Sequence, residues 1–595
     1  MNELDALLDT AFNHYNKRDF EVAEEIARRV LSIEPSHGDG LYLLGLIAFQ
    51  SGALEPASEL LYQAVKLYPN MDHYVLALAS VLHRQGRFDE ALSFYEKYKD
   101  NPVVLAQMGF IYASKGEDDK AIAAFNKTLE QDKMNTDALV GLSTLFQQQG
   151  DLISAEQILL SDISTINSPE IFYRLSVISR LQGKDDVALS YINKALDGLY
   201  NYVYLNEKGL ILEKLGLDDD ALITYQKAVD MNAYYPDSLV GQGNIYMRRC
   251  QYKLAEDAYK KALALDHKFF TAHHNLASLL YKIGRKNEAL DHYQEAVIIN
   301  PKNLSAVYNL AVIQEDIREF SEAAGLYFNA LIGGFENEAL EFRIAATLEG
   351  LFHTSKDGKK QAIDFAKGWV KHFPNSIVAH YTLQALTGKK SSDKKKIATQ
   401  YAQKLYDVFA AEYDEKMQKL NAVVVDETVQ NLQDKTFENV LDLGCGTGTF
   451  GNKLKQNFNL LVGVDISPKM LDIAKQRGVY NEVFCSSVAN YFLSEKRQFD
   501  LIVMLELSGY LEDLFSVFEE IKSHLSQQGL FVFSVEYPKD KANSGLAPIG
   551  RYVYTKEDVL LALDKASLKV VDIKEIDLRR ELDGYAKGAL ITATP

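Results

Sequence analysis

Small and hydrophobic residues recur with a period close to 34 positions over the first 390 residues of the chain. In each period an alanine is followed four residues later by an aromatic or aliphatic residue, and a small residue stands twelve positions before several of these alanines. The spacings between successive anchor alanines are 34, 34, 30, 34, 33, 33, 34, 34, 34 and 39. The anchors are Ala23, Ala57, Ala91, Ala121, Ala155, Ala188, Ala221, Ala255, Ala289, Ala323 and Ala362.

This period indicates pairs of helices that pack on one another. A small residue on each helix lets two backbones approach, and the aromatic ring four residues after the anchor fills the adjoining space. One unit cannot bury its own apolar face, so the copies must stack. The residues resemble the tetratricopeptide repeat, which implies an all-α solenoid with a groove for a protein or peptide partner. The 30-residue and 39-residue steps predict local bends or interruptions in the array.

The repeat pattern ends near residue 390. We expect about eleven repeats over residues 1–387, a linker over residues 388–396 with the sequence GKKSSDKKK from Gly388, and a second domain over residues 397–595. The lysines of the linker indicate either a solvated hinge or a phosphate-binding patch, and the hinge is the better interpretation.

In the second domain the pattern changes to helices that alternate with short apolar strands. Two helices are expected first, near 396–418 and 424–433, and residues 397–435 are expected to form a cap on the domain. Strands are expected near 438–443, 460–465, 481–486, 499–505, 529–536, 568–576 and 587–594. Helical stretches separate the first five strands but not the last two. This alternation predicts a Rossmann-like α/β fold with a mostly parallel, seven-stranded, doubly wound sheet.

Composition and charge limit the classes of function. A chain of 595 residues with 47% hydrophobic and 25% charged residues is expected to form at least two globular domains. The net charge of −18 argues against nucleic acid as a partner. Residues 1–390 carry a net charge of −13, which favours a basic protein segment in the repeat groove.

The cysteines, the apolar runs and the N-terminal stretch indicate the cellular location of the protein. Three widely spaced cysteines without a CxxC pair predict neither a disulfide framework nor a metal site. The apolar runs are too short to span a bilayer, and the acidic N-terminal stretch is unlike a signal peptide. We therefore expect a cytoplasmic protein.

The first strand of the second domain ends in VLDLGCGTGTFG, from Val440 to Gly451. A glycine-rich turn between a strand and a helix brings backbone N–H groups close to a ligand. Gly446, Gly448 and Gly451 also fit the dinucleotide pattern GxGxxG, with Asp465 19 residues after Gly446. Two features argue against a nicotinamide site: Asp442 stands two residues before Gly444, and no second catalytic domain follows the seventh strand in this sequence.

The run D-L-G-C-G-T-G resembles the first motif of class I S-adenosylmethionine-dependent methyltransferases. The resemblance implies that Asp442 lies near the ammonium end of S-adenosylmethionine, and that the carboxylate of Asp465 accepts hydrogen bonds from the ribose hydroxyls. A helix cap is the alternative role for Asp465. The implied cofactor-binding residues around the first two strands are Asp442, Gly444, Cys445, Gly446, Gly448, Asp465, Ile466 and Met470.

The ends of the third and fourth strands carry further candidates. The family places an acid at the end of the third strand to contact the adenine, whereas this sequence has Ser487, followed by Val488. Ser487 is either that contact or a loop serine. The fourth strand ends near Glu506, a cofactor-site residue that we also consider as a catalytic base, with Tyr510 one helical turn later. A structural or capping role for Glu506 is the alternative.

The similarity extends to a group of predicted bacterial methyltransferases that carry tetratricopeptide repeats upstream. In related enzymes the helix that corresponds to Tyr401–Met417 covers the cofactor, which makes Tyr406 and Tyr413 candidate cofactor contacts; a buried apolar stripe is the alternative. In the run GRYVYTKEDV, Arg551 and Tyr552 are candidate substrate contacts. Tyr554 stands where we expect a histidine, so the identity of any general base stays open.

Three hypotheses follow from this combination. The first is a methyltransferase that uses S-adenosylmethionine and acts on a protein or peptide recruited by the repeats. The second is a small-molecule methyltransferase whose repeats serve assembly, and the third is a scaffold with a cofactor-binding domain that does not catalyse. The sequence lacks the Asn/Asp-Pro-Pro-Tyr motif and a cysteine nucleophile after the fourth strand, which argues against methylation of DNA bases.

Overall fold

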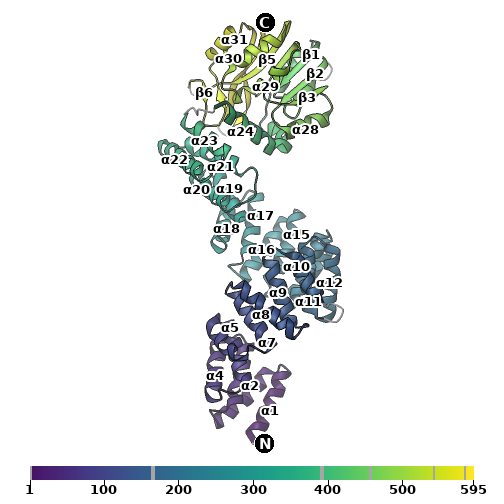
Figure 1. Ribbon diagram of the computed structural model, residues 1–595, viewed down its shortest axis with the longest axis vertical. Helices are drawn as coiled ribbons and strands as arrows, with labels where there is room; N and C mark the ends of the chain where they lie inside the picture. Colours follow the sequence, from purple (N-terminus) through teal and green to yellow (C-terminus); the bar gives the residue numbers. More distant parts are fainter. Residues whose placement is uncertain (1–2, 162–167, 389–393, 455–457, 540–542, 582–583) are drawn as a thin grey trace. The chain divides into compact units, whose positions relative to one another are not determined.

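The computed structural model describes residues 3–161, 168–388, 394–454, 458–539, 543–581 and 584–595 (Figure 1). The chain forms two compact units, Met1–Ala272 and His273–Pro595. Each unit is described by itself below. Among the described residues, every helix is too short or too polar to cross a membrane.

The first unit consists of antiparallel helices in pairs. They are α1 (Glu3–Asn16), α2 (Phe20–Ile33), α3 (Gly38–Gln50), α4 (Leu54–Leu67), α5 (Asp72–Arg84), α6 (Phe88–Tyr95), α7 (Pro102–Ser114), α8 (Asp118–Gln131), α9 (Thr136–Gln148), α10 (Leu152–Leu160), α11 (Pro169–Leu181), α12 (Asp185–Gly198), α13 (Tyr202–Lys214), α14 (Asp218–Met231), α15 (Pro236–Arg248) and α16 (Tyr252–Leu265). The predicted all-α repeat architecture is confirmed.

The repeat pattern corresponds to the packing of these helices. All of the anchor alanines are completely buried. The ring of Tyr225 lies so close to Gly209 that a Cβ atom there would come within 2.4 Å of it, and Phe125 lies against Gly109 in the same way. A side chain on either glycine would therefore separate the helices.

The two irregular spacings also have a structural cause. The short step before Ala121 corresponds to α6, which spans only 8 residues before the 3-10 turn η1 (Glu96–Tyr98). The long step before Ala362 corresponds to α22 (Lys356–His372), which is extended to 17 residues.

The second unit begins with further repeat helices and continues into the α/β domain. α17 (Phe270–Lys282) contains the point of division, and α18 (Lys286–Ile299), α19 (Leu304–Asp316), α20 (Phe320–Ile332), α21 (Leu340–Phe352), α22 and α23 (Ile377–Thr387) follow. The cap consists of α24 (Lys394–Phe409), the turn η2 (Ala410–Glu412), α25 (Tyr413–Lys419) and α26 (Val424–Leu432). The turn η2 interrupts the helix that the sequence predicts over residues 396–418.

The predicted linker is described only at its ends. Gly388 ends α23 with a positive φ of 63°, residues 389–393 lie outside the described residues, and α24 begins at Lys394. The ring of Tyr381 in α23 stacks on that of Tyr401 in α24, with centroids 4.2 Å apart. The last repeat helices and the α/β domain therefore share one compact unit, and the domain boundary near residue 390 stays a prediction.

A seven-stranded sheet forms the centre of the α/β domain. Its strands are β1 (Phe437–Leu443), β2 (Phe458–Asp465), β3 (Glu482–Cys485), β4 (Phe499–Met504), β5 (Leu525–Glu536), β8 (Lys569–Glu581) and β9 (Gly584–Thr594). The spatial order is β3-β2-β1-β4-β5-β9-β8. The first five strands are parallel, and β9 pairs antiparallel with both β5 and β8. The predicted fold class is confirmed, and the last two strands, between which the sequence predicts no helix, pair antiparallel.

Helices cover the sheet as expected for a doubly wound fold. They are α27 (Thr449–Leu454), α28 (Pro468–Arg477), α29 (Val488–Ser494), α30 (Leu514–His524) and α31 (Lys556–Lys565), with a short turn η3 (Ser508–Tyr510) after β4. A small two-stranded sheet of β6 (Gly545–Leu546) and β7 (Tyr552–Val553), which the sequence pattern did not predict, lies between β5 and α31. Because β1 lies between β2 and β4, the residues that follow these three strands meet at one edge of the sheet.

Candidate active site

The glycine-rich turn after β1 adopts a backbone that favours glycine. Gly444, Gly446 and Gly448 have φ angles of 76°, 54° and 84°. A Cβ atom on Gly446 would meet nothing within 4 Å, whereas one on Gly448 would lie 2.9 Å from the ring of Tyr480. The turn thus leaves open space beside Gly446, whereas Gly448 packs tightly against Tyr480.

Asp465 ends β2 and faces this turn. Its Oδ2 accepts a hydrogen bond of 2.9 Å from the backbone N–H of Gly446, and its Oδ1 accepts one of 2.8 Å from Ser467. Burial raises the pKa of Asp465, and the two backbone N–H groups oppose that effect. The hydrogen bonds fix the direction of the carboxylate and leave further lone pairs for a ligand.

Asp442 lies beneath the turn and is almost completely buried, with 2% of its surface exposed. Its Oδ2 accepts a hydrogen bond of 2.6 Å from the hydroxyl of Tyr480. Burial raises the pKa of Asp442 to about 7, the bond from Tyr480 lowers it, and the charge of Asp465 raises it. Tyr480 is a site residue that the sequence did not indicate, because it belongs to no motif and acts through contacts with Gly448, Gly451 and Gly463.

Two acids of the cap hold it against the turns that follow β1 and β2. Asp407 of α24 accepts a hydrogen bond of 2.6 Å from the hydroxyl of Ser467. Asp414 of α25 accepts one of 2.7 Å from the hydroxyl of Thr447 and pairs with Arg477. The cap is thus fastened over the edge of the sheet at two places, which the sequence pattern did not predict.

Tyr406 and Tyr413 of the cap contact each other and the end of β4. The ring of Tyr406 lies edge-on to Tyr413, with centroids 5.9 Å apart, and to Tyr510, with centroids 5.5 Å apart. Burial and the charges of Glu506 and Asp465 all raise the pKa of Tyr413. The structure therefore brings Tyr406, Tyr413 and Tyr510 to the same place.

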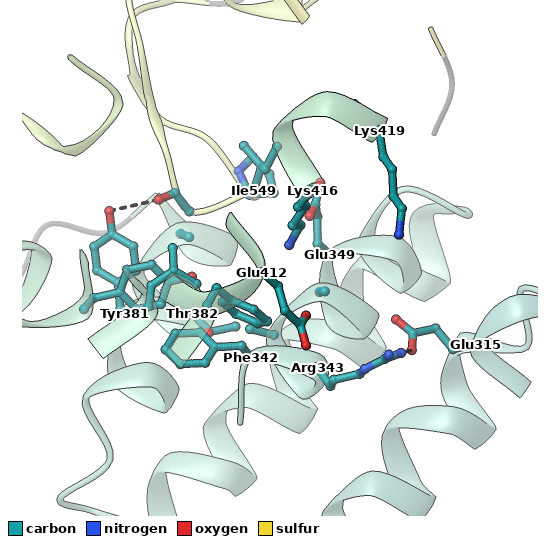
Figure 2. Close-up of a pocket in the computed structure, with 18 of the residues that line it drawn as sticks. Glu315, Phe342, Arg343, Glu349, Tyr381, Thr382, Glu412, Lys416, Lys419 and Ile549 are labelled. Atoms are coloured by element: carbon teal, nitrogen blue, oxygen red, sulfur yellow. Dashed lines mark hydrogen bonds and ion pairs between the residues drawn. The ribbon is translucent and has the colours of Figure 1, made fainter. Parts of the chain in front are cut away.

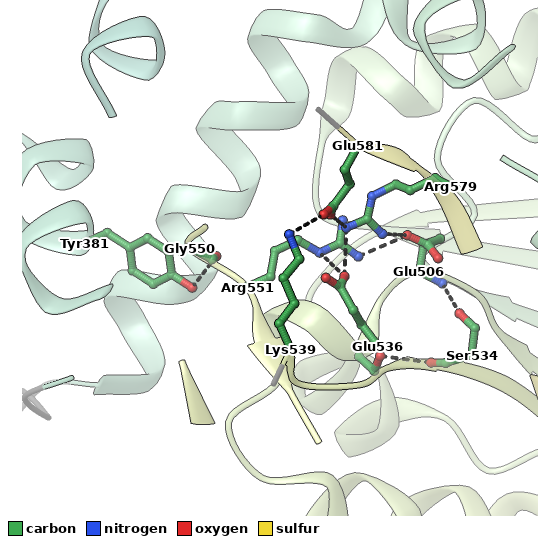
Figure 3. Close-up of polar contacts among 10 residues, drawn as sticks. Tyr381, Glu506, Ser534, Glu536, Lys539, Gly550, Arg551, Arg579 and Glu581 are labelled. Atoms are coloured by element: carbon green, nitrogen blue, oxygen red, sulfur yellow. Dashed lines mark hydrogen bonds and ion pairs between the residues drawn. The ribbon is translucent and has the colours of Figure 1, made fainter. Parts of the chain in front are cut away.

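Glu506 follows β4 in a left-handed conformation, with φ of 56°. Its backbone N–H donates to the hydroxyl of Ser534 over 2.7 Å, and its Oε2 accepts from Arg551 at 3.0 Å and from Arg579 at 2.9 Å. The guanidinium of Arg551 also lies over the ring of Tyr510, 5.5 Å from its centroid. Two cations thus engage the carboxylate that the sequence indicates as a candidate base (Figure 3).

These arginines belong to a larger polar network (Figure 3). Glu536 at the end of β5 accepts from Arg579 at 2.7 Å and pairs with Arg551 at 3.2 Å. Glu581 at the end of β8 pairs with Arg579 at 3.4 Å and with Lys539 at 2.8 Å. Arg579 and Glu536 were not predicted as site residues.

The other predicted residues lie in varied surroundings. Ser487 caps α29, and its hydroxyl accepts from the backbone N–H of Asn490 over 3.3 Å. Met470 and Tyr552 are buried, Tyr552 in the hydrophobic core and paired with Leu546 between β7 and β6. Cys445 is also buried, and Ile466 and Val488 are half-buried. The ligand contacts predicted for these residues stay predictions.

Models of known protein families match residues in both parts of the chain. A family model described as a methyltransferase domain matches residues 413–570. Models described as TPR repeat, as tetratricopeptide repeat, and as anaphase-promoting complex, cyclosome, subunit 3 match residues 243–284, 270–303 and 16–98.

Similar sequences fall into the same two groups. A TPR repeat-containing protein of Methanocaldococcus jannaschii is 28% identical over 278 residues, which cover 42% of this chain and 48% of the relative. A ubiquinone biosynthesis O-methyltransferase of Haemophilus ducreyi is 24% identical over 158 residues, covering 23% of this chain and 66% of the relative. A malonyl-[acyl-carrier protein] O-methyltransferase of Bacillus anthracis is 30% identical over 139 residues, covering 22% of this chain and 51% of the relative.

The chain spans about half the length of the curated relatives it matches first. The repeat helices, the sheet order and the matches at both ends of the chain agree with one another. The chain therefore joins tetratricopeptide repeats in its N-terminal part to a methyltransferase domain in its C-terminal part.

Proposed function

We propose that the protein is an S-adenosylmethionine-dependent methyltransferase that acts on a protein or peptide recruited by its repeats. The observation that carries the proposal is the arrangement of the glycine turn and Asp465. The N–H of Gly446 orients the carboxylate of Asp465, and the space in front of Gly446 is open.

The residues present fit the proposed cofactor. The oriented carboxylate of Asp465 retains lone pairs for the two hydroxyls of a ribose. The positive φ and the lack of a side chain at Gly446, where a Cβ atom would meet nothing within 4 Å, allow close approach of a ligand to the backbone. When bound, S-adenosylmethionine supplies an electrophilic methyl group on a sulfonium.

The chain's own contribution is to position the acceptor and to exclude water. The cap, held by Asp407 and Asp414, covers the edge of the sheet. Oε2 of Glu506 accepts hydrogen bonds from both guanidiniums, which leaves its other oxygen, Oε1. We therefore assign to Glu506 the role of orienting the molecule that receives the methyl group, through Oε1. Tyr510 and Arg551 form the wall beside it.

A protein acceptor is favoured by the last repeat helices, which share a compact unit with the methyltransferase domain, and by the acidic charge of residues 1–390. The second candidate is a small acceptor with a hydroxyl or carboxyl group. The two similar O-methyltransferases favour that alternative.

One experiment separates the two candidates. The full chain is incubated with tritiated S-adenosylmethionine and an extract of its source, and the products are divided by size. We expect label in the protein fraction, and expect Asp465→Ala to abolish it. Label confined to small molecules would instead identify the small-acceptor enzyme, and label in neither fraction would contradict methyl transfer.

A further inference from the structure

A cavity of about 520 Å³ lies where the last repeat helices meet the cap (Figure 2). Its walls come from α19, α21, α23, α24, η2 and α25 and from the loop of residues 548–550. One end is aromatic: Tyr381 stacks on Tyr401, and the ring of Phe342 meets Tyr401 at 5.6 Å and Phe409 at 5.9 Å between centroids. The size and the aromatic lining are those of a ligand site.

The charged end of the cavity is balanced. Three cations line it, Arg343, Lys416 and Lys419, together with the acids Glu315, Glu412 and Glu415. Arg343 pairs with Glu315 at 2.8 Å and Lys419 with Glu415 at 2.6 Å. Lys416 lies over the ring of Phe409, 4.6 Å from its centroid, and Glu412 is its electrostatic partner.

Glu349 of α21 also lines this cavity and adds a further acid. It lines a second cavity of about 650 Å³ as well, so it lies where the two adjoin. Among the described residues, the carboxylate of Glu349 forms neither an ion pair nor a hydrogen bond.

The nearby polar network supplies no ion pair to Glu349: its exposed cation Lys539 acts on Glu349 electrostatically but pairs with Glu581 at 2.8 Å. That network contains the acids Glu506, Glu536 and Glu581, and its cations are Arg551, Arg579 and Lys539. Acids and cations are equal in number there, as they are at the charged end of the cavity. Within the described surroundings, Glu349 is therefore a carboxylate in excess of the available cations.

We propose that this cavity binds the cationic side chain of an arginine or lysine in a polypeptide, with Glu349 as its counter-ion. A guanidinium or ammonium group would pair with the excess carboxylate while its aliphatic stem lies against the aromatic rings. A bound anion would be repelled by the carboxylate of Glu349, and a bound neutral group would leave the negative charge of that carboxylate without a counter-ion.

The placement of the cavity relates it to methyl transfer. Gly550 lines the cavity, and the next residue, Arg551, pairs with Glu506 in the candidate active site. A residue bound here would hold the neighbouring part of the same polypeptide close to Glu506 and Tyr510. This step, which makes the polypeptide the methyl acceptor, rests on the proposed function, whereas binding of the cation does not.

The electrostatic surroundings predict how binding changes with pH. Burial raises the pKa of Glu349 to about 7, Glu581 on β8 and Glu536 on β5 add to the effect, and Lys539 after β5 opposes it. Tyr401 of α24 faces Glu349, and His353 at the end of α21 lines the adjoining cavity. Because the cation pairs only with the ionised carboxylate, affinity for an arginine side chain should rise about tenfold from pH 6 to pH 8.

The test measures binding of fluorescein-labelled tetra-arginine to the full chain by fluorescence anisotropy. Glu349→Gln should weaken binding at pH 8 about tenfold and remove most of its pH dependence. Glu336→Gln changes the net charge equally at an exposed position before α21 and should leave binding within about twofold. Tetra-citrulline, which has the same shape without charge, should bind Glu349→Gln and the unaltered chain equally.

A second variant tests whether a loss of binding by Glu349→Gln comes from misfolding rather than from the loss of charge. Glu349→Asp keeps the charge and should retain the rise in affinity with pH. Equal binding of tetra-arginine by the unaltered chain, Glu349→Gln and Glu336→Gln would overturn the inference. Titration of the same samples with S-adenosylhomocysteine tests the proposed function separately, since Glu349 lies outside the glycine turn and its substitution should leave that affinity unchanged.

Discussion

The hydroxyl of Tyr381, in the last repeat helix, donates a hydrogen bond of 3.1 Å to the carbonyl of Gly550, in the loop before β7. Gly550 has a φ of 74°, and a Cβ atom there would lie 3.4 Å from the ring of Tyr381. The next residue in the chain is Arg551, which pairs with Glu506. A side chain of the repeats therefore holds the loop that carries part of the candidate active site (Figure 3).

Replacing Tyr381 by Phe should loosen this loop without disturbing the glycine turn. We expect methyl transfer to fall by about threefold to tenfold, because one hydrogen bond contributes about 0.5–1.5 kcal/mol. Affinity for S-adenosylhomocysteine should stay unchanged. Tyr293→Phe removes a hydroxyl bonded to Ser278 at 2.6 Å within the repeats and serves as the control. Equal activity of the two variants would show that Tyr381 has no positioning role.

Arg551 should be far more important to stability than an exposed cation of the same domain. Its side chain is 14% exposed and pairs with both Glu506 and Glu536. Because Arg551→Ala leaves two buried carboxylates short of a cation, it should lower the free energy of unfolding by about 3–5 kcal/mol. Lys475→Ala, at an exposed pair with Asp472, should change it by less than about 1 kcal/mol. Denaturant unfolding followed by circular dichroism checks the difference, and similar losses would refute it.

Replacement by alanine should destabilise the domain more at Gly448 than at Gly478, a glycine with a similar backbone conformation. Gly478 also has a positive φ, 66°, but a Cβ atom there would meet nothing within 4 Å. At Gly448 the added atom would press on Tyr480, which holds Asp442. Gly448→Ala should therefore destabilise the domain by about 1–3 kcal/mol more than Gly478→Ala. Thermal unfolding of both variants measures this difference, and equal melting temperatures would contradict it.

The stability of the domain should depend on pH through Asp442. Its pKa is about 7 in the folded protein and about 3.9 in an unfolded chain, so the folded state binds more protons between these values. The contribution of Asp442 is fully present below about pH 4 and is lost as the pH rises to 7.

Asparagine at position 442 cannot titrate but can still accept the bond from Tyr480. The melting temperature of Asp442→Asn, relative to the unaltered chain, should therefore increase from pH 5 to pH 8 in differential scanning calorimetry. A difference that stays constant over this range would show that Asp442 does not titrate there.

The repeats and the sheet could be predicted because both leave local patterns in the sequence. Each anchor alanine is buried at the helix contact that its spacing implies. The glycine turn has the positive φ angles that its composition suggests. The break at η2 was missed because the helical pattern continues through Ala410–Glu412, and only tertiary contacts such as Asp414 with Thr447 explain it.

The polar network could not be predicted for a different reason. Arg579, Glu536 and Tyr480 are separated from the motifs in sequence and join them only when the strands pair. The same is true of Glu349, a repeat residue that reaches the methyltransferase domain through the packing of α21. Charge compensation depends on which side chains meet in space, and the periodicity of the chain does not record it.

Isothermal titration of the full chain with S-adenosylhomocysteine is the most direct test of the cofactor assignment. We predict saturable one-to-one binding in the micromolar range, weakened at least about tenfold by Asp465→Ala because the ribose hydroxyls lose a charged acceptor. Absence of binding at millimolar ligand, or preferential binding of NADH, would contradict the assignment.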